Sequence, residues 1–446
     1  MNYIKRDLES DLLSFLNDSS LNKDVLLVAG ARQVGKSTII NHVLKSSDRQ
    51  AIVINLEKEP RIRSKIDGCI DFKDFTALLR DEFHFDPSAG NVLFIDESQE
   101  SLRLGEYVRF MKEEWNHASV ILTGSTLTRL FREGIRYPVG RVRHITMTPL
   151  SFGEFLRATG DSHLAEYLAN PGEITPARHE YLLGRLDDYL GVGGLPAVVI
   201  DFVGGKKWRE RRESVIADLE QDFIRIFGEE TYPIVKACLR SVAHFVGNPS
   251  KHTTVIPGAD TRLTKKIGEV FSRLEAWHLV LLSNQYGMSA EHSFGYHPKR
   301  YLYDTGILRH LREMAVPSLR LLDRDNPEAR TLIGGIIENQ VAIDLSRNGR
   351  TVAGWKKTSA GNDIDFIVKI GESAWPMECK ASLSLKGTHL RGTLDYLKLY
   401  KIKYGFIMSA APYEVRIMPG KETIVNIPLY SAEFSRKIIA ELTGML

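Results

Sequence analysis

Continuous apolar runs recur along the first third of the chain. The longest lie at residues 25–29, 51–56, 92–95 and 120–122. Runs of this kind, without the alternation of a half-exposed strand, are typical of parallel strands that are covered on both faces. Residues 3–17 instead carry apolar positions at helical spacing, which predicts a helix before the first strand. The pattern therefore predicts an α/β fold with a parallel sheet at the N-terminus.

The pattern changes beyond this sheet. Residues 156–230 are expected to be mostly helical, with a glycine-rich break at residues 191–196. Two apolar-periodic stretches, 234–246 and 261–277, then precede a short apolar strand at 279–282. A helix, a basic helix and an apolar wing are the layout of a winged helix-turn-helix, which we expect here.

A last domain is expected after residues 316–328, where prolines and charges interrupt the periodicity and indicate a linker. An amphipathic helix at 334–345 is followed by alternating strands at 363–368 and 375–380. The expected division is an α/β domain with a helical extension at 1–230, a winged-helix domain at 231–315 and a smaller α/β domain at 331–446.

The first candidate functional motif follows the first apolar run directly. It is the sequence Gly-Ala-Arg-Gln-Val-Gly-Lys-Ser at residues 30–37. Such a loop lets the backbone approach phosphates and forms an anion nest at a helix N-terminus. Lys36 would neutralise β- and γ-phosphate charge, and Ser37 would bind Mg²⁺. A glycine-rich turn before a helix is the alternative. On the first interpretation, the residues expected to contact ATP are Gly30, Ala31, Gln33, Val34, Gly35, Lys36, Ser37 and Thr38.

Two later strand ends carry polar groups that suit this chemistry. One apolar run ends in Asp96 and Glu97, where Asp96 would hold Mg²⁺ through its hydration shell and Glu97 would polarise the attacking water. Another ends in Thr-Gly-Ser-Thr, at the edge where open α/β sheets bind ligands. Ser125 or Thr126 is expected there to sense the γ-phosphate or to position water. For Asp96 and Glu97, a buried strand that simply ends at solvent is the alternative.

Composition and charge indicate which compartment and which partners to expect. The three cysteines are far apart and show no metal-site spacing, so neither a disulfide framework nor a zinc site is expected and a reducing cytoplasm fits best. No window approaches the roughly 18 apolar residues of a spanning helix, so no membrane partner is expected. A net charge of +3 does not by itself indicate nucleic acid. Local basic clusters are either solvated faces or phosphate contacts: Lys206, Lys207, Arg209, Arg211, Arg212, Arg262, Lys265, Lys266 and Arg273.

The C-terminal strands carry a second constellation. Asp365 lies on the first strand, and Glu378 and Lys380 share a face of the second because they are two residues apart. This gives two metal-binding carboxylates and an ammonium. Acidic, apolar and basic residues also alternate on any half-exposed strand, so an exposed salt-bridge pattern is the alternative.

Several motifs, taken together, carry a family resemblance. The phosphate loop, Ile-Asp-Glu at 95–97, Thr-Gly-Ser-Thr at 123–126, the Gly140-Arg141 step and Pro-Leu-Ser-Phe-Gly-Glu-Phe at 149–155 resemble the AAA-type ATPases of bacteria and archaea. The resemblance implies an arginine finger at Arg141, with Arg129 and Arg132 as rivals, although most arginines only solvate a surface. A finger that acts in trans would imply a homo-oligomer.

The C-terminal constellation resembles the PD-(D/E)XK nuclease superfamily, in which an aspartate and a Glu-x-Lys pair hold Mg²⁺ and activate water. Glu338 would be the helical carboxylate that completes the site. The order of Glu338, Asp365 and the Glu378–Lys380 pair is similar to the restriction-endonuclease-like domain of unknown function 4143, which follows this kind of ATPase. The segment at residues 299–306 matches a recurring segment before that domain. Asp363 stands where glutamate is common.

The leading hypothesis is a cytoplasmic ATPase that uses ATP and Mg²⁺ and whose nucleotide state controls a DNA-handling nuclease domain with Mg²⁺ or Mn²⁺. A first alternative is an ATP-dependent switch that binds DNA or a partner without cleavage. A second is a regulator of protein complexes with no nucleic-acid role, which predicts no salt-sensitive DNA affinity.

Overall fold

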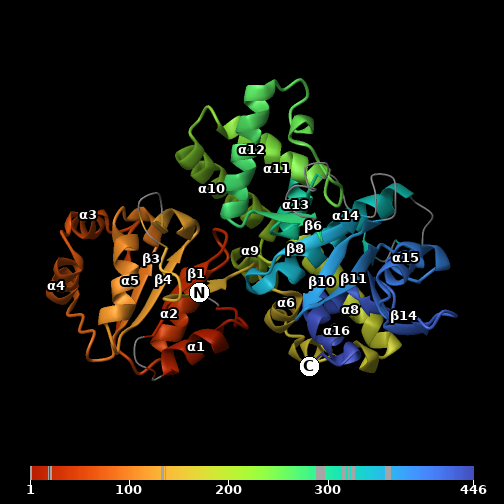
Figure 1. Ribbon diagram of the computed structural model, residues 1–446, viewed down its shortest axis with the longest axis horizontal. Helices are drawn as coiled ribbons and strands as arrows, with labels where there is room; N and C mark the ends of the chain where they lie inside the picture. Colours follow the sequence, from red (N-terminus) through yellow and green to blue (C-terminus); the bar gives the residue numbers. More distant parts are fainter. Residues whose placement is uncertain are drawn as a thin grey trace. The chain divides into compact units, whose positions relative to one another are not determined.

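The computed structural model describes residues 3–18, 20, 23–131, 135, 137–287, 297–313, 318–319, 322, 327–356 and 363–445 (Figure 1). Two compact units can be distinguished. One contains Lys5–Thr148 together with Ala276–His278, and the other contains Pro149–Glu275 and Leu279–Leu446. The predicted boundary at residue 315 lies outside the described residues, and the three-domain division stays a prediction.

The first unit is built on a parallel five-stranded sheet in the order β2-β3-β4-β1-β5. The central strands are almost entirely buried, as their continuous apolar runs predict. β2 lies at an edge, and its Val53 is 43% exposed, so this run is covered less completely than the pattern suggested. The strands are β1 (Val25–Ala29), β2 (Ala51–Asn55), β3 (Val92–Asp96), β4 (Ser119–Gly124) and β5 (Val142–Thr146).

Helices on both faces of this sheet complete a core rich in aromatic rings. Phe75 stacks on Tyr107 with ring centroids 4.7 Å apart, and Trp115 packs against both Phe72 and Phe85. The expected lead-in helix begins at Glu9 rather than near residue 3. The helices are α1 (Glu9–Asn17), α2 (Lys36–Lys45), α3 (Pro60–Gly68), α4 (Phe72–Phe83) and α5 (Leu104–Glu114), with short 3₁₀ turns η1 (Ser98–Glu100) and η2 (Leu127–Phe131).

The second unit begins with helices, as expected for residues 156–230. The glycine-rich break separates α8 from α9: Gly193 has φ of 84°, a conformation that favours glycine, and a Cβ there would lie 2.5 Å from Asp304 Oδ1. The helices are α6 (Phe152–Ala158), α7 (Ser162–Ala165), α8 (Pro176–Val192), α9 (Pro196–Val203), α10 (Trp208–Phe227), α11 (Tyr232–His244) and α12 (Thr261–Ala276).

The strand expected at residues 279–282 forms part of a larger sheet. β6 (Val280–Gln285) pairs antiparallel with β7 (Lys299–Leu302) and parallel with β8 (Val352–Lys356), which pairs in turn with β9 (Asp363–Ile364). The sheet therefore joins the expected central region to the expected C-terminal domain. Sequence pattern alone did not indicate this pairing, because the two strands are separated by about seventy residues of chain.

A second five-stranded sheet, in the order β10-β11-β12-β14-β13, forms the C-terminal part of this unit. α14 packs against β7 and β11, and α15 packs against β11 and β12, so helices position both sheets. The remaining elements are β10 (Phe366–Ile370), β11 (Ser373–Lys380), β12 (Tyr404–Ser409), β13 (Glu414–Ile417), β14 (Thr423–Pro428), α13 (Thr305–Leu311), α14 (Pro327–Ser346), α15 (Arg391–Tyr400) and α16 (Ser435–Thr443). No helix within the described residues is long and apolar enough to cross a membrane.

Candidate nucleotide site and C-terminal charge cluster

The glycine-rich loop connects β1 to α2 at the carboxyl edge of the first sheet. Its two glycines have positive φ angles, 147° at Gly30 and 95° at Gly35. A Cβ at Gly30 would lie 2.3 Å from the Met147 carbonyl oxygen, so only glycine fits. Gly35 precedes the first turn of α2, where backbone N–H groups are free of intrahelical partners and suit an anion.

Lys36 is the first residue of α2, and its side chain is directed back to the loop. The ammonium donates hydrogen bonds to the carbonyl oxygens of Gly30 at 2.9 Å and Ala31 at 2.8 Å. Burial lowers the pKa of Lys36 to about 8, and the nearby carboxylates of Glu97 and Asp96 oppose this shift. A buried cation held by neutral carbonyls can exchange them for phosphate oxygens, so the site fits a nucleotide phosphate.

An arginine that sequence reasoning passed over braces the loop. Arg6 is buried, and its guanidinium donates to the Val34 carbonyl at 3.0 Å and to the Thr148 carbonyl at 2.8 Å. It therefore ties the loop to the segment that follows β5. In the sequence, Arg6 is a single arginine before an amphipathic helix and belongs to no motif, so its role could not be predicted.

The two acidic residues after β3 have different surroundings. Asp96 Oδ1 accepts a hydrogen bond from the Thr123 hydroxyl at 2.5 Å, and its Oδ2 accepts one from the Asn55 amide at 2.9 Å. Glu97 has a left-handed backbone, with φ of 51°, and accepts a hydrogen bond from Gln99. Burial raises the pKa of Glu97, which favours its role as a proton acceptor over that of a solvated surface charge.

Neighbouring strand ends bring the predicted hydroxyls to the same edge. β3 and β4 are adjacent and parallel, so Ser125 and Thr126 follow β4 at the carboxyl edge where Asp96 follows β3. Both hydroxyl residues are buried. Ser37 is half-buried in the first turn of α2, and Thr38 is exposed beside it. An oxygen set of a serine hydroxyl and an aspartate is of the kind that Mg²⁺ prefers.

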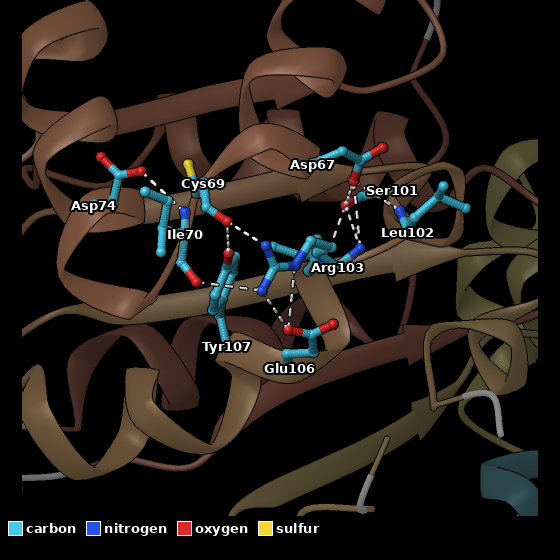
Figure 2. Close-up of polar contacts among 10 residues, drawn as sticks. Asp67, Cys69, Ile70, Asp74, Ser101, Leu102, Arg103, Glu106 and Tyr107 are labelled. Atoms are coloured by element: carbon cyan, nitrogen blue, oxygen red, sulfur yellow. Dashed lines mark hydrogen bonds and ion pairs between the residues drawn. The ribbon is translucent and has the colours of Figure 1, made fainter. Parts of the chain in front are cut away.

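The segment beyond Glu97 is anchored to the turn between α3 and α4 (Figure 2). Asp67 Oδ1 accepts hydrogen bonds from the Ser101 hydroxyl at 2.6 Å and from the Leu102 backbone N–H at 2.8 Å. Arg103 donates to the Cys69 and Ile70 carbonyls and pairs with Glu106 in the first turn of α5. This network fixes the chain that carries Glu97, and its residues gave no sequence signal of their own.

The candidate arginine fingers occupy different edges of the sheet. Arg141 precedes β5, which is parallel to β1 with Val25 opposite Val142, so it lies at the amino edge. There its guanidinium donates to Glu113 at 2.7 Å. A five-residue strand separates this edge from the phosphate loop of the same chain, a length of about 16 Å. Arg129 is exposed in η2 after Thr126, and Arg132 lies outside the described residues.

The strand predicted at residues 363–368 is interrupted at Asp365, which lies between β9 and β10, and the three residues of the C-terminal constellation nevertheless lie close together. β10 and β11 pair antiparallel, and the Asp365 backbone N–H donates to Glu378 Oε2 at 3.3 Å. Asp365 Oδ2 accepts a hydrogen bond from the Cys379 backbone N–H at 2.9 Å, and Lys380 pairs with Glu378. Asp365, Glu378 and Lys380 are therefore neighbours, and Glu338 reaches the same cluster from α14.

A lysine missing from the prediction lies at the centre of this cluster. The Lys299 ammonium is 2.8 Å from Glu338 Oε1 and 2.8 Å from Asp365 Oδ1. Tyr301, on the same face of β7, donates its hydroxyl to Glu338 at 2.7 Å. Lys299 belongs to the recurring segment at residues 299–306, but no chemical role was expected for this lysine from the sequence.

The carboxylates of this cluster perturb one another. Burial, together with the Asp365 charge, raises the pKa of Glu338 to about 7 and that of Glu378 to about 8. Lys299 lowers the pKa of Asp365 against the effect of burial. No group of three metal-binding side chains suited to a metal ion occurs among the described residues. The cluster as it stands does not fit a divalent cation, because an ammonium already bridges two of its carboxylates.

Other predicted motifs have structural roles here. Asp304, in the segment at residues 299–306, accepts hydrogen bonds from the Gly194 N–H at 2.7 Å and from the Ile307 N–H, so it caps α13 and ties it to the glycine-rich break. In the basic run after α9, Arg211 pairs with Asp201 and Lys207 pairs with Glu210. Arg211 and Lys207 are exposed, whereas Arg212 of the same run is partly buried and donates a hydrogen bond to the Gly191 carbonyl at 3.0 Å.

Three family matches cover successive parts of the chain. Residues 22–156 match an AAA domain, residues 183–318 match a domain of unknown function, DUF8612, and residues 333–430 match the domain of unknown function DUF4143. The first match spans the parallel sheet, the phosphate loop and the two acidic residues after β3. The chain therefore contains a region similar to an AAA domain and, further along, a region similar to DUF4143, in the order that the resemblance implied.

Similar whole proteins are distant. A Haemophilus influenzae protein described as uncharacterized is 24% identical over 362 residues, which are 77% of this chain and 79% of that protein. The Walker-type ATPase PABY2304 of Pyrococcus abyssi has a TM-score of 0.46 at 14% identity, covering 70% of this chain and 96% of its own. The Aeropyrum pernix ORC1 protein, solved in complex with DNA, has a TM-score of 0.27 at 13% identity, covering 70% and 93%.

Proposed function

We propose that this protein hydrolyses ATP and that its nucleotide state controls how its C-terminal domain handles DNA. The observation that carries the ATP part is the buried Lys36 ammonium, held by two loop carbonyls at the start of α2 and close to Asp96 and Glu97. A cation in this position gains most from a polyphosphate, because the loop offers it only neutral partners.

Each residue then has a defined task. Bound ATP and Mg²⁺ would supply the phosphoryl group and neutralise its charge. Lys36 would turn from the loop carbonyls to the β- and γ-phosphate oxygens, while Ser37 and Asp96 would hold the ion. Glu97 would accept the proton of the attacking water, and its raised pKa suits it to that task. Thr126 would position the water or sense the γ-phosphate.

The arginine finger would act between copies of the chain. Arg141 lies at the amino edge of the sheet, away from the phosphate loop of its own chain, so we place it in the site of a neighbouring copy in a homo-oligomer. Mixing Arg141→Ala subunits with Glu97→Gln subunits should then restore part of the hydrolysis that each variant lacks. Activity that is independent of mixing and of dilution would favour Arg129 in cis.

The DNA part rests on the region expected to be a winged helix. Arg262 and Lys265 are exposed on α12, where a recognition helix would present its cations to phosphates. Fluorescence anisotropy with duplex, branched and single-stranded DNA, at several salt concentrations and with ATP or ADP, tests this part. Arg262→Ala with Lys265→Ala should weaken binding and reduce its salt dependence, since each phosphate contact contributes about one unit to the slope. Absence of salt-sensitive affinity would support a regulator of protein complexes instead.

Two functions of the C-terminal domain, cleavage of DNA and binding without cleavage, can be distinguished. In the first, the cluster of Glu338, Asp365, Glu378 and Lys380 belongs to a PD-(D/E)XK nuclease that uses Mg²⁺ or Mn²⁺. In the second, the domain binds DNA or a partner without cleaving it. The Lys299 bridge favours the second form, because it occupies the carboxylates that a metal would need. Incubation of labelled DNA with the protein, with and without ATP and Mn²⁺, decides between them.

A further inference from the structure

Three carboxylates from different elements converge on one partly enclosed place in the second unit. Glu338 comes from α14, Asp365 from the turn between β9 and β10, and Glu378 from β11. Convergent carboxylates repel one another strongly when they are buried, so their charge must be compensated by protons or by a cation. The identity of that cation decides what the cluster can do.

Lys299 meets the requirement from within the chain. Its ammonium bridges Glu338 and Asp365 with equal distances of 2.8 Å, and the three side chains are only 12–13% exposed. Opposite charges at this distance in a shielded site raise the pKa of Lys299 well above its usual value, so the ammonium stays charged. Lys299 therefore remains a cation over the physiological pH range.

The oxygens that a divalent ion would use already have other partners. Glu338 Oε1 binds both Lys299 and Tyr301, while the two oxygens of Asp365 bind Lys299 and the Cys379 N–H. Both oxygens of Glu378 accept hydrogen bonds as well. The remaining oxygen, Glu338 Oε2, faces Gly247, where a Cβ would come within 2.6 Å. A hydrated Mg²⁺ that entered this cluster would have to displace the ammonium from Glu338 Oε1 and Asp365 Oδ1, and it would be repelled by the ammonium charge until it did so.

Lys299 does not come from the segment that supplies the carboxylates. It lies on β7, outside residues 333–430, which match DUF4143. β7 pairs with β6, which pairs with β8 of the C-terminal region, and this pairing holds the strand beside α14. The counter-ion is thus delivered by the part of the chain that precedes the domain.

We propose that Lys299 is a built-in counter-ion that takes the place of a divalent cation between Glu338 and Asp365. The native cluster is a metal-free junction between β7 and the C-terminal domain, and loss of the ammonium converts it into a divalent-cation site. This inference concerns the C-terminal cluster alone and does not depend on ATP hydrolysis.

Titration of nucleotide-free, full-length protein with Mn²⁺, followed by the electron paramagnetic resonance signal of free Mn²⁺, tests the inference. Wild type, Lys299→Met and Lys299→Met with Asp365→Asn share the phosphate loop, so any difference in stoichiometry reports the cluster. Lys299→Met should bind one more Mn²⁺ per chain than wild type, and the double variant should return to the wild-type number. Lys112→Met, which removes a lysine paired with Asp24 outside this cluster and leaves the bridge intact, is the matched control and should match wild type.

A second comparison needs no change at Lys299. Wild type and Asp365→Asn should bind equal numbers of Mn²⁺, since the inference leaves no metal at the cluster in either protein. A wild-type chain that loses one Mn²⁺ when Asp365 is replaced would overturn the inference. A folded Lys299→Met protein whose Mn²⁺ stoichiometry is unchanged would overturn it equally. Mn²⁺ should also raise the unfolding temperature of Lys299→Met more than that of wild type.

Discussion

Lys36 and Lys299 are both buried lysines in acidic surroundings, yet their chemical states are opposite. The Lys36 ammonium bonds to two neutral carbonyls, and burial lowers its pKa to about 8. The Lys299 ammonium bonds to two carboxylates, which raise its pKa well above the usual range. The desolvation is similar in kind, so the direct partners decide the sign of the shift.

The two lysines therefore belong to different kinds of site. Lys36 lies in a site that can bind an anionic ligand, whereas the charge of Lys299 is already compensated by residues of the chain. Lys36 makes its hydrogen bonds to neutral carbonyls and gains stabilisation when phosphate oxygens replace them. Lys299 already has two carboxylate partners, so an incoming anion finds no excess positive potential and an incoming cation is repelled by the ammonium. Buried lysine is therefore no indicator of a binding site until its partners are known.

The largest expected effect comes from Lys36→Met. Removal of the ammonium should abolish ATP binding or reduce hydrolysis at least ~10²-fold, since the loop loses the cation directed at the β- and γ-phosphates. The urea midpoint should stay equal or rise, because a lysine whose folded pKa is depressed destabilises the fold at neutral pH. Lys45→Met, exposed at the other end of α2, is the control for both measurements. Unchanged turnover would refute the assignment of the site.

Lys299→Met should produce the reverse pattern. Leaving two buried carboxylates without their cation should cost about 3–5 kcal/mol of unfolding free energy. The exposed pair Lys65–Glu82 gives the matched comparison, since Lys65→Met should cost no more than about 1 kcal/mol. Urea denaturation of the three proteins measures both values, and a loss of less than 1 kcal/mol at Lys299 would show that the bridge is not important for stability.

Glu97→Gln sharpens the comparison within the ATP site. The amide keeps the shape and the Gln99 contact but cannot accept a proton, so hydrolysis should slow by at least about 10²-fold while ATP affinity is kept. Glu100→Gln, in the adjoining turn, should leave turnover close to wild type. If Glu97→Gln weakens binding without a separate effect on rate, then Glu97 has a structural role.

The smallest expected effect is a proton linkage. Without nucleotide, Lys36 titrates near pH 8; phosphate favours the charged form and raises its pKa in the complex. Binding above pH 8 must therefore take up a proton, and ATP affinity should fall about tenfold between pH 7 and pH 9. Calorimetry at pH 8.5 in two buffers of different ionisation enthalpy measures the uptake. A binding enthalpy that is the same in both buffers would contradict the lowered pKa.

The sequence itself determined the parts of the molecule that depend on neighbours along the chain. The apolar runs fixed the parallel strands, and the spacing of Gly30, Gly35 and Lys36 fixed the phosphate loop, because a turn and a helix start need only contiguous residues. The alternation at residues 375–380 likewise placed Glu378 and Lys380 on one face of β11, whereas the break in the strand at Asp365 was not predicted.

Tertiary structure decided what depends on sheet order and on distant pairing. Arg141 is close to the other nucleotide motifs in sequence, but the position of β5 puts it at the opposite edge from the phosphate loop. Lys299 is 66 residues from Asp365, and only the packing of β7 against α14 brings its ammonium between the two carboxylates. Local patterns encode the direction of a side chain within its own strand or helix, whereas the neighbours that set its charge state come from whichever elements bury it.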